Sequence, residues 1–284
     1  AAWQARRREQ EREPEETDGR PVLRRPNVPR VAQGVIAALV LVALVVGGLL
    51  AGPWIRERTT AQRAPLPTPS AAVSLPSQPG QSLPPTVDPA GSPIGRPADS
   101  LRAWAGEHEA LGIPVVALQA YGYAQAVIAQ VQPSCHLSWT VLAGIGRVES
   151  DHGRYRGATL NPDGTSTPRI IGATIEGITP KVVADTDRGA LDGDATSDRP
   201  VGPMQLSPAT WKTWAVDADR DGKSDPFDID DASMATAYYL CAGGHDLGTG
   251  KGWWNAVLSY KDQPPYAARV YSESDRYGRQ SRTL

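Results

Sequence analysis

Residues 138–153 read SWTVLAGIGRVESDHG, and this stretch decides the fold. Ser138 is a favourable helix N-cap, and the apolar side chains after it recur at the three- and four-residue spacing of one helix face. Glu149 follows Ile145 by four residues, so its carboxylate lies in line with that face. Gly153 is expected to end the helix. The stretch therefore predicts a buried helix with one carboxyl group near its C-terminal end.

The rest of the C-terminal part of the chain also predicts helices. Apolar residues repeat with a helical period over residues 115–131, and Pro133 closes that segment. Further helices fit residues 208–215, 232–241, 252–260 and 265–277. The stretch from Gly153 to Asp198 is rich in Gly, Thr and Asp and shows little periodicity, which predicts loops and short strands beside a cleft. We therefore expect a mainly α fold.

The N-terminal third of the 284 residues has a different composition. Residues 1–33 mix Arg with acidic residues and lack apolar periodicity, which predicts a disordered cytoplasmic tail. Residues 34–52 carry no charge and are mostly Val, Leu and Ala, close to the length of about 20 residues that a membrane-spanning helix needs. Residues 53–97 are rich in Pro, Ser and Ala and predict an extended linker. Function is therefore to be sought in residues 98–284.

The apolar run at residues 34–52 predicts a single-pass membrane anchor, with the tail in the cytoplasm and the C-terminal domain outside. Arg residues flank both ends of the run, so the positive-inside rule decides this orientation only weakly. The alternative is a secretory signal that is cleaved after Ala51. A net charge of −2 argues against nucleic-acid partners, and protein partners cannot be named from the sequence.

Cys135 and Cys241 are the two cysteines of the chain, and each lies beside an expected helix end. A disulfide between them would stabilise the domain by about 2–4 kcal/mol and requires an oxidising compartment. Two buried free thiols are the alternative. A disulfide would agree with a domain outside the cytoplasm.

Residues 217–228, DADRDGKSDPFD, have the spacing of a calcium-binding loop. Gly222 falls at the sharp turn, and the carbonyl of Lys223 falls at loop position 7. The expected ligands are Asp217, Asp219, Asp221, Lys223, Asp225 and Asp228. Position 12 is Asp rather than the usual Glu, which shortens the reach and lowers the affinity. The alternative is an Asp-rich surface turn that holds no ion.

Glu149 is the candidate acid of the domain. Burial raises the pKa of a carboxyl group, which then keeps its proton near neutral pH and can donate it to a leaving oxygen. The alternative is an exposed Glu149 paired with Arg147 or Arg154. His152 follows Asp151, but no placed Ser or Cys nucleophile accompanies them, so a hydrolase triad is not expected.

Three motifs resemble the lytic murein transglycosylases of the membrane-bound B type, which have a lysozyme-like core. These are AGIGRVES at residues 143–150, VGPMQLSPATW at 201–211 and AVLSY at 256–260, with the Asp-rich loop before the last of them. The resemblance covers roughly residues 130–278 and implies a lysozyme-like catalytic domain. The site residues that it implies are Glu149 as the single catalytic acid and base, and Met204, Gln205, Tyr260 and Ser150 as substrate-binding residues.

The sequence departs from this family at Lys261, where an Asn usually follows the Tyr. The substrate contact of that Asn is therefore lost, unless Lys261 replaces it with a hydrogen bond. The departure leaves two kinds of protein open, an active enzyme and a catalytically silent module that binds peptidoglycan.

The resemblance implies cleavage of the β-1,4 bond between MurNAc and GlcNAc in peptidoglycan, with a 1,6-anhydro-MurNAc end. In that scheme Glu149 protonates the glycosidic oxygen and then takes the proton of the C6 hydroxyl, so catalysis needs no cofactor and no second carboxylate. A muramidase that uses water is the alternative, and ordinary glycoside hydrolysis takes two carboxylates. The candidates for the second are Asp185, Asp187, Asp192, Asp194 and Asp198. The alternative for this cluster is a solvated or cation-bound loop.

Overall fold

The computed structural model describes residues 84, 85, 87, 95–173 and 183–284, which fall within the unit Leu66–Leu284. The expected tail, the expected membrane span at residues 34–52 and most of the expected linker lie outside the described residues. Within the described residues, no helix combines the length and the apolar character that a membrane span requires.

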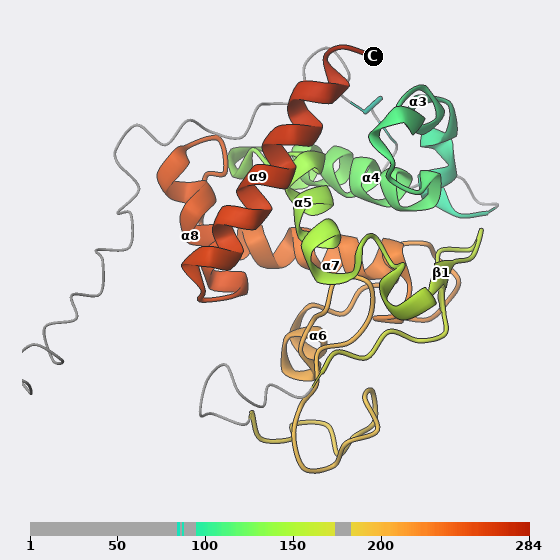
Figure 1. Ribbon diagram of the computed structural model, residues 1–284, viewed down its shortest axis with the longest axis vertical. Coiled ribbons are helices and arrows are strands. Elements are labelled where there is room, and N and C mark those ends of the chain that lie inside the picture. The colour runs from blue at the N-terminus through green and yellow to red at the C-terminus, as the bar shows by residue number, and fades with distance from the viewer. Residues whose placement is uncertain (1–83, 86, 88–94, 174–182) are drawn as a thin grey trace, which may run out of the picture. The chain divides into compact units, whose positions relative to one another are not determined.

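The described part of the chain is mainly helical, as predicted (Figure 1). Its α-helices are α3 (Arg102–Glu107), α4 (Val115–Val131), α5 (Trp139–Ser150), α6 (Pro208–Trp214), α7 (Ile229–Ala242), α8 (Gly250–Tyr260) and α9 (Pro264–Ser281). The short 3-10 helices are η1 (Pro97–Leu101), η2 (Glu109–Leu111), η3 (Pro133–Cys135) and η4 (Tyr155–Gly157). The patterns identified the five long α-helices and α6, whereas α3 and the 3-10 turns are too short to show a period.

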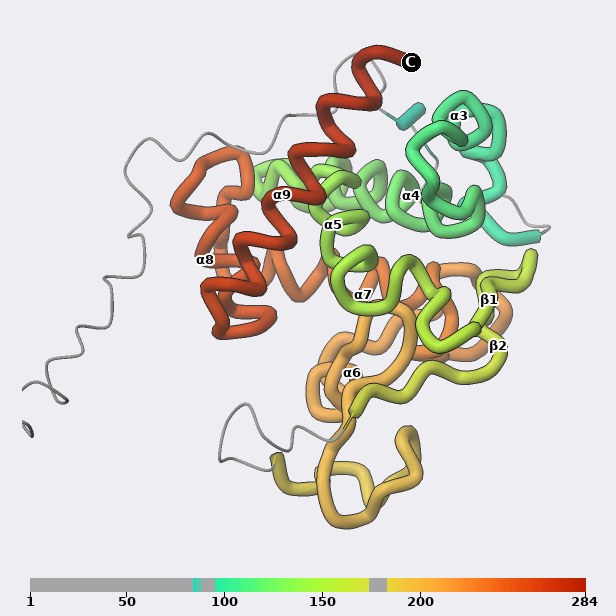
Figure 2. The backbone as a smooth tube through the Cα atoms, in the orientation of Figure 1, coloured from blue at the N-terminus to red at the C-terminus, as the bar shows by residue number. Residues whose placement is uncertain are grey.

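In the region expected to hold loops and short strands, the described residues form one small antiparallel sheet (Figure 2). Strand β1 (Thr159–Leu160) pairs with strand β2 (Ser166–Thr167), with Thr159 opposite Thr167. Most other described residues between Gly153 and Asp198 are in turns and loops, because Gly and Asp favour turns over regular elements.

Helix α5 is the central element of the fold. Every residue from Trp139 to Gly146 is buried, and α9 runs along α5 as its most extensive partner (Figure 1). Gly144 makes this close contact possible, because a Cβ at this position would lie 2.3 Å from Ser274 Oγ and 2.8 Å from the Val270 carbonyl oxygen. Gly144 therefore allows α9 to pack against the helix that carries Glu149.

The start of α5 is as predicted, and its end differs. The Ser138 hydroxyl accepts a hydrogen bond from the Thr140 N–H and caps the helix. The helix ends at Ser150, three residues before Gly153, because Asp151 already adopts the left-handed conformation (φ 53°). Asp tolerates this conformation better than most residues do. Glu149 thus lies in the last turn of the helix, next to the point where the chain leaves it.

Two positions of the expected linker are packed against the folded domain. Val87 is 6% exposed, and its carbonyl oxygen accepts a hydrogen bond from Gln130 Nε2 at 2.6 Å. The side chain of Arg96 is 5% exposed and forms an ion pair with Asp230. Both residues belong to the folded unit, which begins before Ala98.

Candidate functional site

Glu149 lies at an open pocket between the C-terminal end of α5 and one face of α9. The pocket has a volume of about 560 Å³, and Tyr155, Arg269, Ser272 and Glu273 contribute to its walls. The Glu149 side chain is 8% exposed, so it is nearly dry but reaches the pocket surface. The alternative of an exposed Glu149 paired with Arg147 or Arg154 is wrong, because both of these Arg side chains pair with Asp151 instead.

Two opposing effects set the pKa of Glu149. Burial raises the pKa, and the positive charge of Lys261 is the largest effect that lowers it. Lys261 Nζ lies 3.5 Å from each carboxylate oxygen of Glu149, and its side chain is 42% exposed. The Tyr266 hydroxyl and the charge of Arg269 lower the pKa further, and the net direction is upward. A raised pKa is the property that a general acid near neutral pH needs.

Tyr260 contacts the segment beside Glu149 rather than the carboxylate itself. Its hydroxyl donates a hydrogen bond to the Met204 carbonyl oxygen. Burial, and then the negative charge of Glu149, raise the pKa of Tyr260 far above its usual value. Tyr260 therefore stays neutral and fixes the backbone at Met204.

The side chains of Met204 and Ser150, which the resemblance implies as substrate-binding residues, are both buried, and Ser150 is among the residues that line the pocket. The Met204 side chain is fully buried in the core, because an apolar side chain at this position packs beneath the site rather than facing it. The Ser150 hydroxyl is also buried; it donates to the Pro203 carbonyl oxygen at 2.5 Å and accepts from the Gly153 N–H at 2.8 Å. Ser150 thus joins the end of α5 to the segment Pro203–Gln205.

Gln205 is half-buried and lies in the left-handed conformation, with a φ of 53°. Its side-chain amide donates to the Gly202 carbonyl oxygen at 2.9 Å. Its Oε1 atom packs close to Gly172, where a Cβ would approach it to 2.5 Å. Gln205 keeps a partly exposed position, but its amide is already held by the loop.

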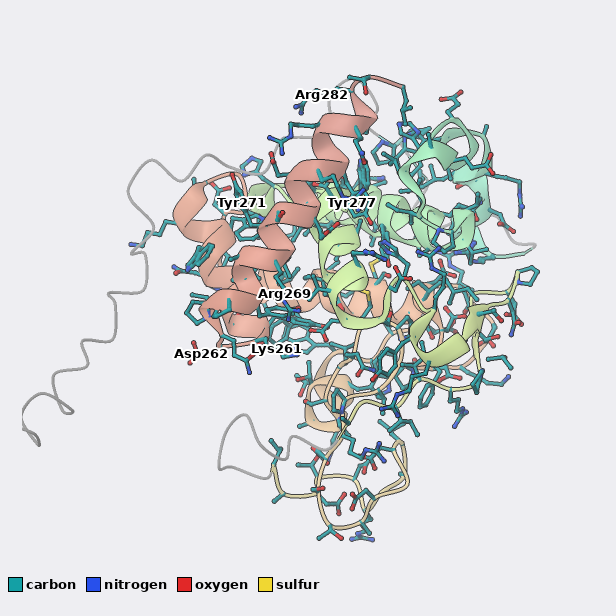
Figure 3. The ribbon with its side chains drawn as sticks, in the orientation of Figure 1. Lys261, Asp262, Arg269, Tyr271, Tyr277 and Arg282 are labelled. Carbon is teal, nitrogen blue, oxygen red and sulfur yellow. A yellow bond between two sulfur atoms is a disulfide. The ribbon has the colours of Figure 1, made fainter. Side chains whose placement is uncertain are left out.

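The sequence did not single out Tyr266 or Arg269. Both lie on α9, together with Glu273, at the spacing of one helix face. Tyr266 is 1% exposed, and Lys261 Nζ lies 4.9 Å from the centre of its ring. Figure 3 shows Lys261 at the turn between α8 and α9, with Arg269 further along α9. The periodicity of residues 265–277 was visible in the sequence, but the helix that this face would contact was not.

The Asp-rich loop gathers a different set of carboxylates from the one expected. Oxygens of Asp217, Asp219 and Asp231 lie within 4.8 Å of one another. Asp228, the expected ligand at position 12, instead caps α7 by accepting the N–H groups of Asp230 and Asp231. The physical reason is that α7 begins at Ile229, so that the carboxylate of Asp231, in its first turn, reaches back to the loop.

The other expected ligands of this loop are turned toward its own backbone. Asp221 Oδ1 accepts the Lys223 N–H at 2.8 Å, and Asp225 Oδ1 accepts the Phe227 N–H at 2.9 Å. The Asp225 N–H donates a hydrogen bond to Asp231 Oδ2 at 2.8 Å. Asp217 Oδ1 is buried and has no hydrogen-bond partner among the described residues.

A second acidic group lies in the loop that was considered for a second catalytic carboxylate. Oxygens of Asp185, Asp187 and Asp198 lie within 4.8 Å of one another. Each of these carboxylates accepts hydrogen bonds from backbone N–H groups of its own loop. Asp192 and Asp194 do the same. None of the five is among the residues that line the pocket at Glu149.

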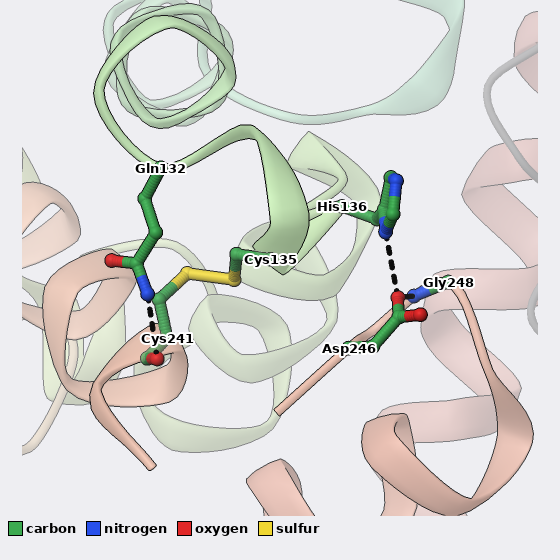
Figure 4. Close-up of a disulfide and its surroundings, with 6 residues drawn as sticks. All are labelled: Gln132, Cys135, His136, Cys241, Asp246 and Gly248. Carbon is green, nitrogen blue, oxygen red and sulfur yellow. Dashed lines mark hydrogen bonds and ion pairs between the residues drawn. A yellow bond between two sulfur atoms is a disulfide. The ribbon is translucent and has the colours of Figure 1, made fainter. Parts of the chain in front are cut away.

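The disulfide between Cys135 and Cys241 is present, as expected, and excludes the free thiols (Figure 4). It joins η3 to the last turn of α7, with a Cα–Cα distance of 5.5 Å. Gln132 Nε2 donates to the Cys241 carbonyl oxygen at 2.9 Å beside it. The bridge thus fastens the start of the α5 segment to the helix that carries Asp231.

The fold and the site define a mainly helical domain with one nearly dry carboxyl group at an open pocket. The chain matches no protein-family model, no curated protein and no solved structure. We therefore infer the chemistry of the site from its own residues and from the motif resemblance.

Proposed function

We propose that the protein is a peptidoglycan lytic transglycosylase with Glu149 as acid and then base. One observation carries this proposal: the carboxyl group of Glu149, which is 8% exposed and has a pKa raised by burial, borders an open pocket of about 560 Å³. Pockets of this size accommodate small ligands or sugar units. The order of the three motifs supports the same activity.

In the proposed reaction Glu149 donates its proton to the glycosidic oxygen as the bond from that oxygen to C1 of MurNAc breaks. The N-acetyl group of the same sugar stabilises the positive charge at C1. Glu149, now a carboxylate beside the Lys261 ammonium, then accepts the C6 hydroxyl proton while O6 bonds to C1. The protons balance, no water enters, and Glu149 returns to its starting form.

A muramidase is the second candidate, because two more carboxylates line the same pocket. Asp151 and Glu273 both border it. Asp151 is paired with Arg147 and Arg154, and Glu273 is paired with Arg276 at 2.6 Å. These ion pairs hold both groups in place through one oxygen each, Asp151 Oδ1 and Glu273 Oε2.

Product mass separates these candidates. The chain, incubated with purified cell wall, is expected to release soluble muropeptides that are one water lighter than hydrolysis products. Products of hydrolytic mass would favour the muramidase, and cosedimentation with the wall without any release would favour a silent binding module. The Cys135–Cys241 disulfide supports action outside the cytoplasm; anchoring through residues 34–52 remains part of the proposal.

The charge of Lys261 is expected to set the alkaline limit of the activity. A general acid must be protonated, so activity falls as the pH rises through the pKa of Glu149. Lys261 lowers that pKa, and Lys261→Met should therefore shift the alkaline limb of the kcat/KM profile to higher pH. Arg269, Tyr260 and Tyr266 face the same carboxylate and remain in place.

The matched control for this prediction is Lys251→Met, which removes an exposed charge from the start of α8. Its pH profile should coincide with that of the unmodified protein. An alkaline limb that moves to lower pH in Lys261→Met, or stays where it was, would contradict the prediction.

We also propose that Asp217, Asp219 and Asp231 hold a structural Ca²⁺. Carboxylate oxygens are the ligands that this ion prefers. The residues fit it because Asp217 offers a buried oxygen without a partner among the described residues. Burial and the neighbouring charges of Asp221 and Asp217 raise the pKa of Asp219. A cation would relieve this repulsion and tie the loop to α7.

Calcium is expected to raise the melting temperature of the chelator-treated protein by roughly 5–10 °C at about 100 times the dissociation constant. Asp231→Asn should abolish this increase, whereas Asp262→Asn, an exposed change in the α8–α9 turn, should retain it. Because Asp231 also accepts backbone hydrogen bonds, the response to calcium is compared rather than the stability itself. Equal responses in both variants would refute this metal site.

A further inference from the structure

The pocket that Glu149 borders is also lined by residues that the proposed reaction does not use, and its charged groups are not all paired. Its remaining walls come from the end of α5, from Tyr155 and from the α9 residues Arg269, Ser272 and Glu273. The pocket has a volume of about 560 Å³. This volume leaves room for a substituent of the sugar on which Glu149 acts.

The other charged side chains of this pocket already have partners. Asp151 is paired with Arg147 and Arg154. The remaining carboxylates are matched as well: Glu273 is held by Arg276 and Glu149 by Lys261.

Arg269 differs from these groups. It is exposed, lines the pocket and forms no ion pair with any residue of the described ranges. Its guanidinium is close enough to Glu149 for its charge to act on that carboxyl group. Its place on α9 is shown in Figure 3. A guanidinium in this setting matches a carboxylate with two parallel hydrogen bonds.

We propose that Arg269 binds a carboxylate on the lactyl or peptide arm of the muramyl residue, which makes this pocket a subsite for the anionic arm of the glycan. This inference rests on the proposed function, because that function supplies a substrate whose sugar carries such an arm. GlcNAc has no arm and no carboxylate. The subsite would therefore orient the strand, placing MurNAc rather than GlcNAc with its C1 at Glu149.

Tyr155, in η4, supports this assignment. It lines the pocket and is 37% exposed, and Arg156 lies over its ring at 5.2 Å from the centre. A ring held in this way offers an apolar surface to the methyl group of the lactyl ether or to the first residue of a stem peptide. The pocket thus combines one cationic group for the carboxylate with one flat surface for the arm.

The bound carboxylate would also act on the acid. Arg269 lowers the pKa of Glu149 in the free protein, and pairing with a substrate carboxylate would cancel much of that effect. Substrate with an anionic arm would therefore favour the protonated form of Glu149 that the first step requires.

The test measures binding separately from cleavage. Calorimetry on the full chain carrying Glu149→Gln would compare three probes: the GlcNAc–MurNAc disaccharide with a tripeptide stem, the same disaccharide with a free lactyl carboxylate, and chitobiose. The first two probes distinguish a stem carboxylate from the lactyl carboxylate. At least one of them is expected to bind more tightly than chitobiose, by about tenfold, as for one charge-assisted contact.

Adding Arg269→Gln should remove this preference, and Arg269→Lys should restore part of it. Arg279→Gln is the matched control, since it removes an exposed charge from the same helix at a position that does not line the pocket. The preference should persist there. A preference that survives Arg269→Gln, or that is absent from the start, overturns the subsite.

Cleavage of glycan strands by the chain with Glu149 intact is measured in parallel. Arg269→Gln is expected to raise KM about tenfold for strands with the arm and to change kcat little. If no strand is cleaved while Arg269 still discriminates the probes, the proposed function fails and the subsite stands. If strands are cleaved but Arg269→Gln leaves both binding and KM unchanged, the subsite fails and the function stands.

Discussion

The Glu149→Gln variant is expected to release no measurable anhydro-muropeptides from purified cell wall. Gln has nearly the shape of Glu but carries no acidic proton, so neither proton transfer of the proposed reaction can occur. General acid–base catalysis contributes about 10²–10⁴-fold to a rate, and here one residue supplies both transfers. The loss should therefore be at least of that size.

The fold of this variant should be unaffected. Glu149 lies in the last turn of α5 and is tied to the rest of the domain by Lys261, which is partly exposed and can stay hydrated when the carboxylate is removed. The melting curve is expected to match that of the unmodified chain. Glu107→Gln, an exposed change on α3, is the matched control and should keep normal turnover.

The same assay separates the two enzymatic candidates when it is applied to Glu273→Gln. A muramidase that uses Glu273 as its second carboxylate would lose most of its activity. A transglycosylase needs one carboxyl group and should keep much of its rate. Near-normal release of product by Glu149→Gln would remove Glu149 from its role in either mechanism.

Arg96→Met is expected to cause the largest loss of stability, about 3–5 kcal/mol in the free energy of unfolding. The Arg96 guanidinium is buried and donates to Asp230, to Gln119 Oε1 at 2.9 Å and to the Val116 carbonyl oxygen at 2.7 Å. The side chain of Asp230 is 0% exposed. Met fills part of the space but leaves the buried carboxylate without its cation.

Urea unfolding of paired variants would measure this effect. Arg102→Met is the matched control, because Arg102 pairs with Asp99 at the surface, where its side chain is 66% exposed; its loss should stay below about 1 kcal/mol. Combining Arg96→Met with Asp230→Leu should recover much of the stability, since an apolar pair of similar volume leaves no charge buried. Equal losses for Arg96→Met and Arg102→Met would contradict a structural role for the buried pair.

Arg96 also illustrates what the sequence pattern could not reveal. It stands among Pro, Ser and Gly residues, which predict a spacer, and its partner Asp230 is 134 residues further along the chain. Composition describes a local preference of the chain. It does not indicate that a distant buried carboxylate requires a cation from that segment.

Local features were predicted well. The Ser138 cap and the period of residues 115–131 lead to α5 and α4 because capping and amphipathicity act between residues a few positions apart. The end of α5 was misplaced by two residues, because Asp151 takes the left-handed conformation that Gly153 was expected to provide.

By itself, the sequence determined that this chain ends in a mainly helical domain, that Glu149 lies near the end of a buried helix, and that one pair of cysteines was available for a disulfide. Only the tertiary structure decided that Lys261 and Arg269 face Glu149, that Asp231 replaces Asp228 among the loop carboxylates, and that Met204 is buried. The physical reason is distance along the chain. Periodicity and capping arise within a few residues, whereas the electrostatic environment of Glu149 is made by α9 and the α8–α9 turn, more than a hundred residues away.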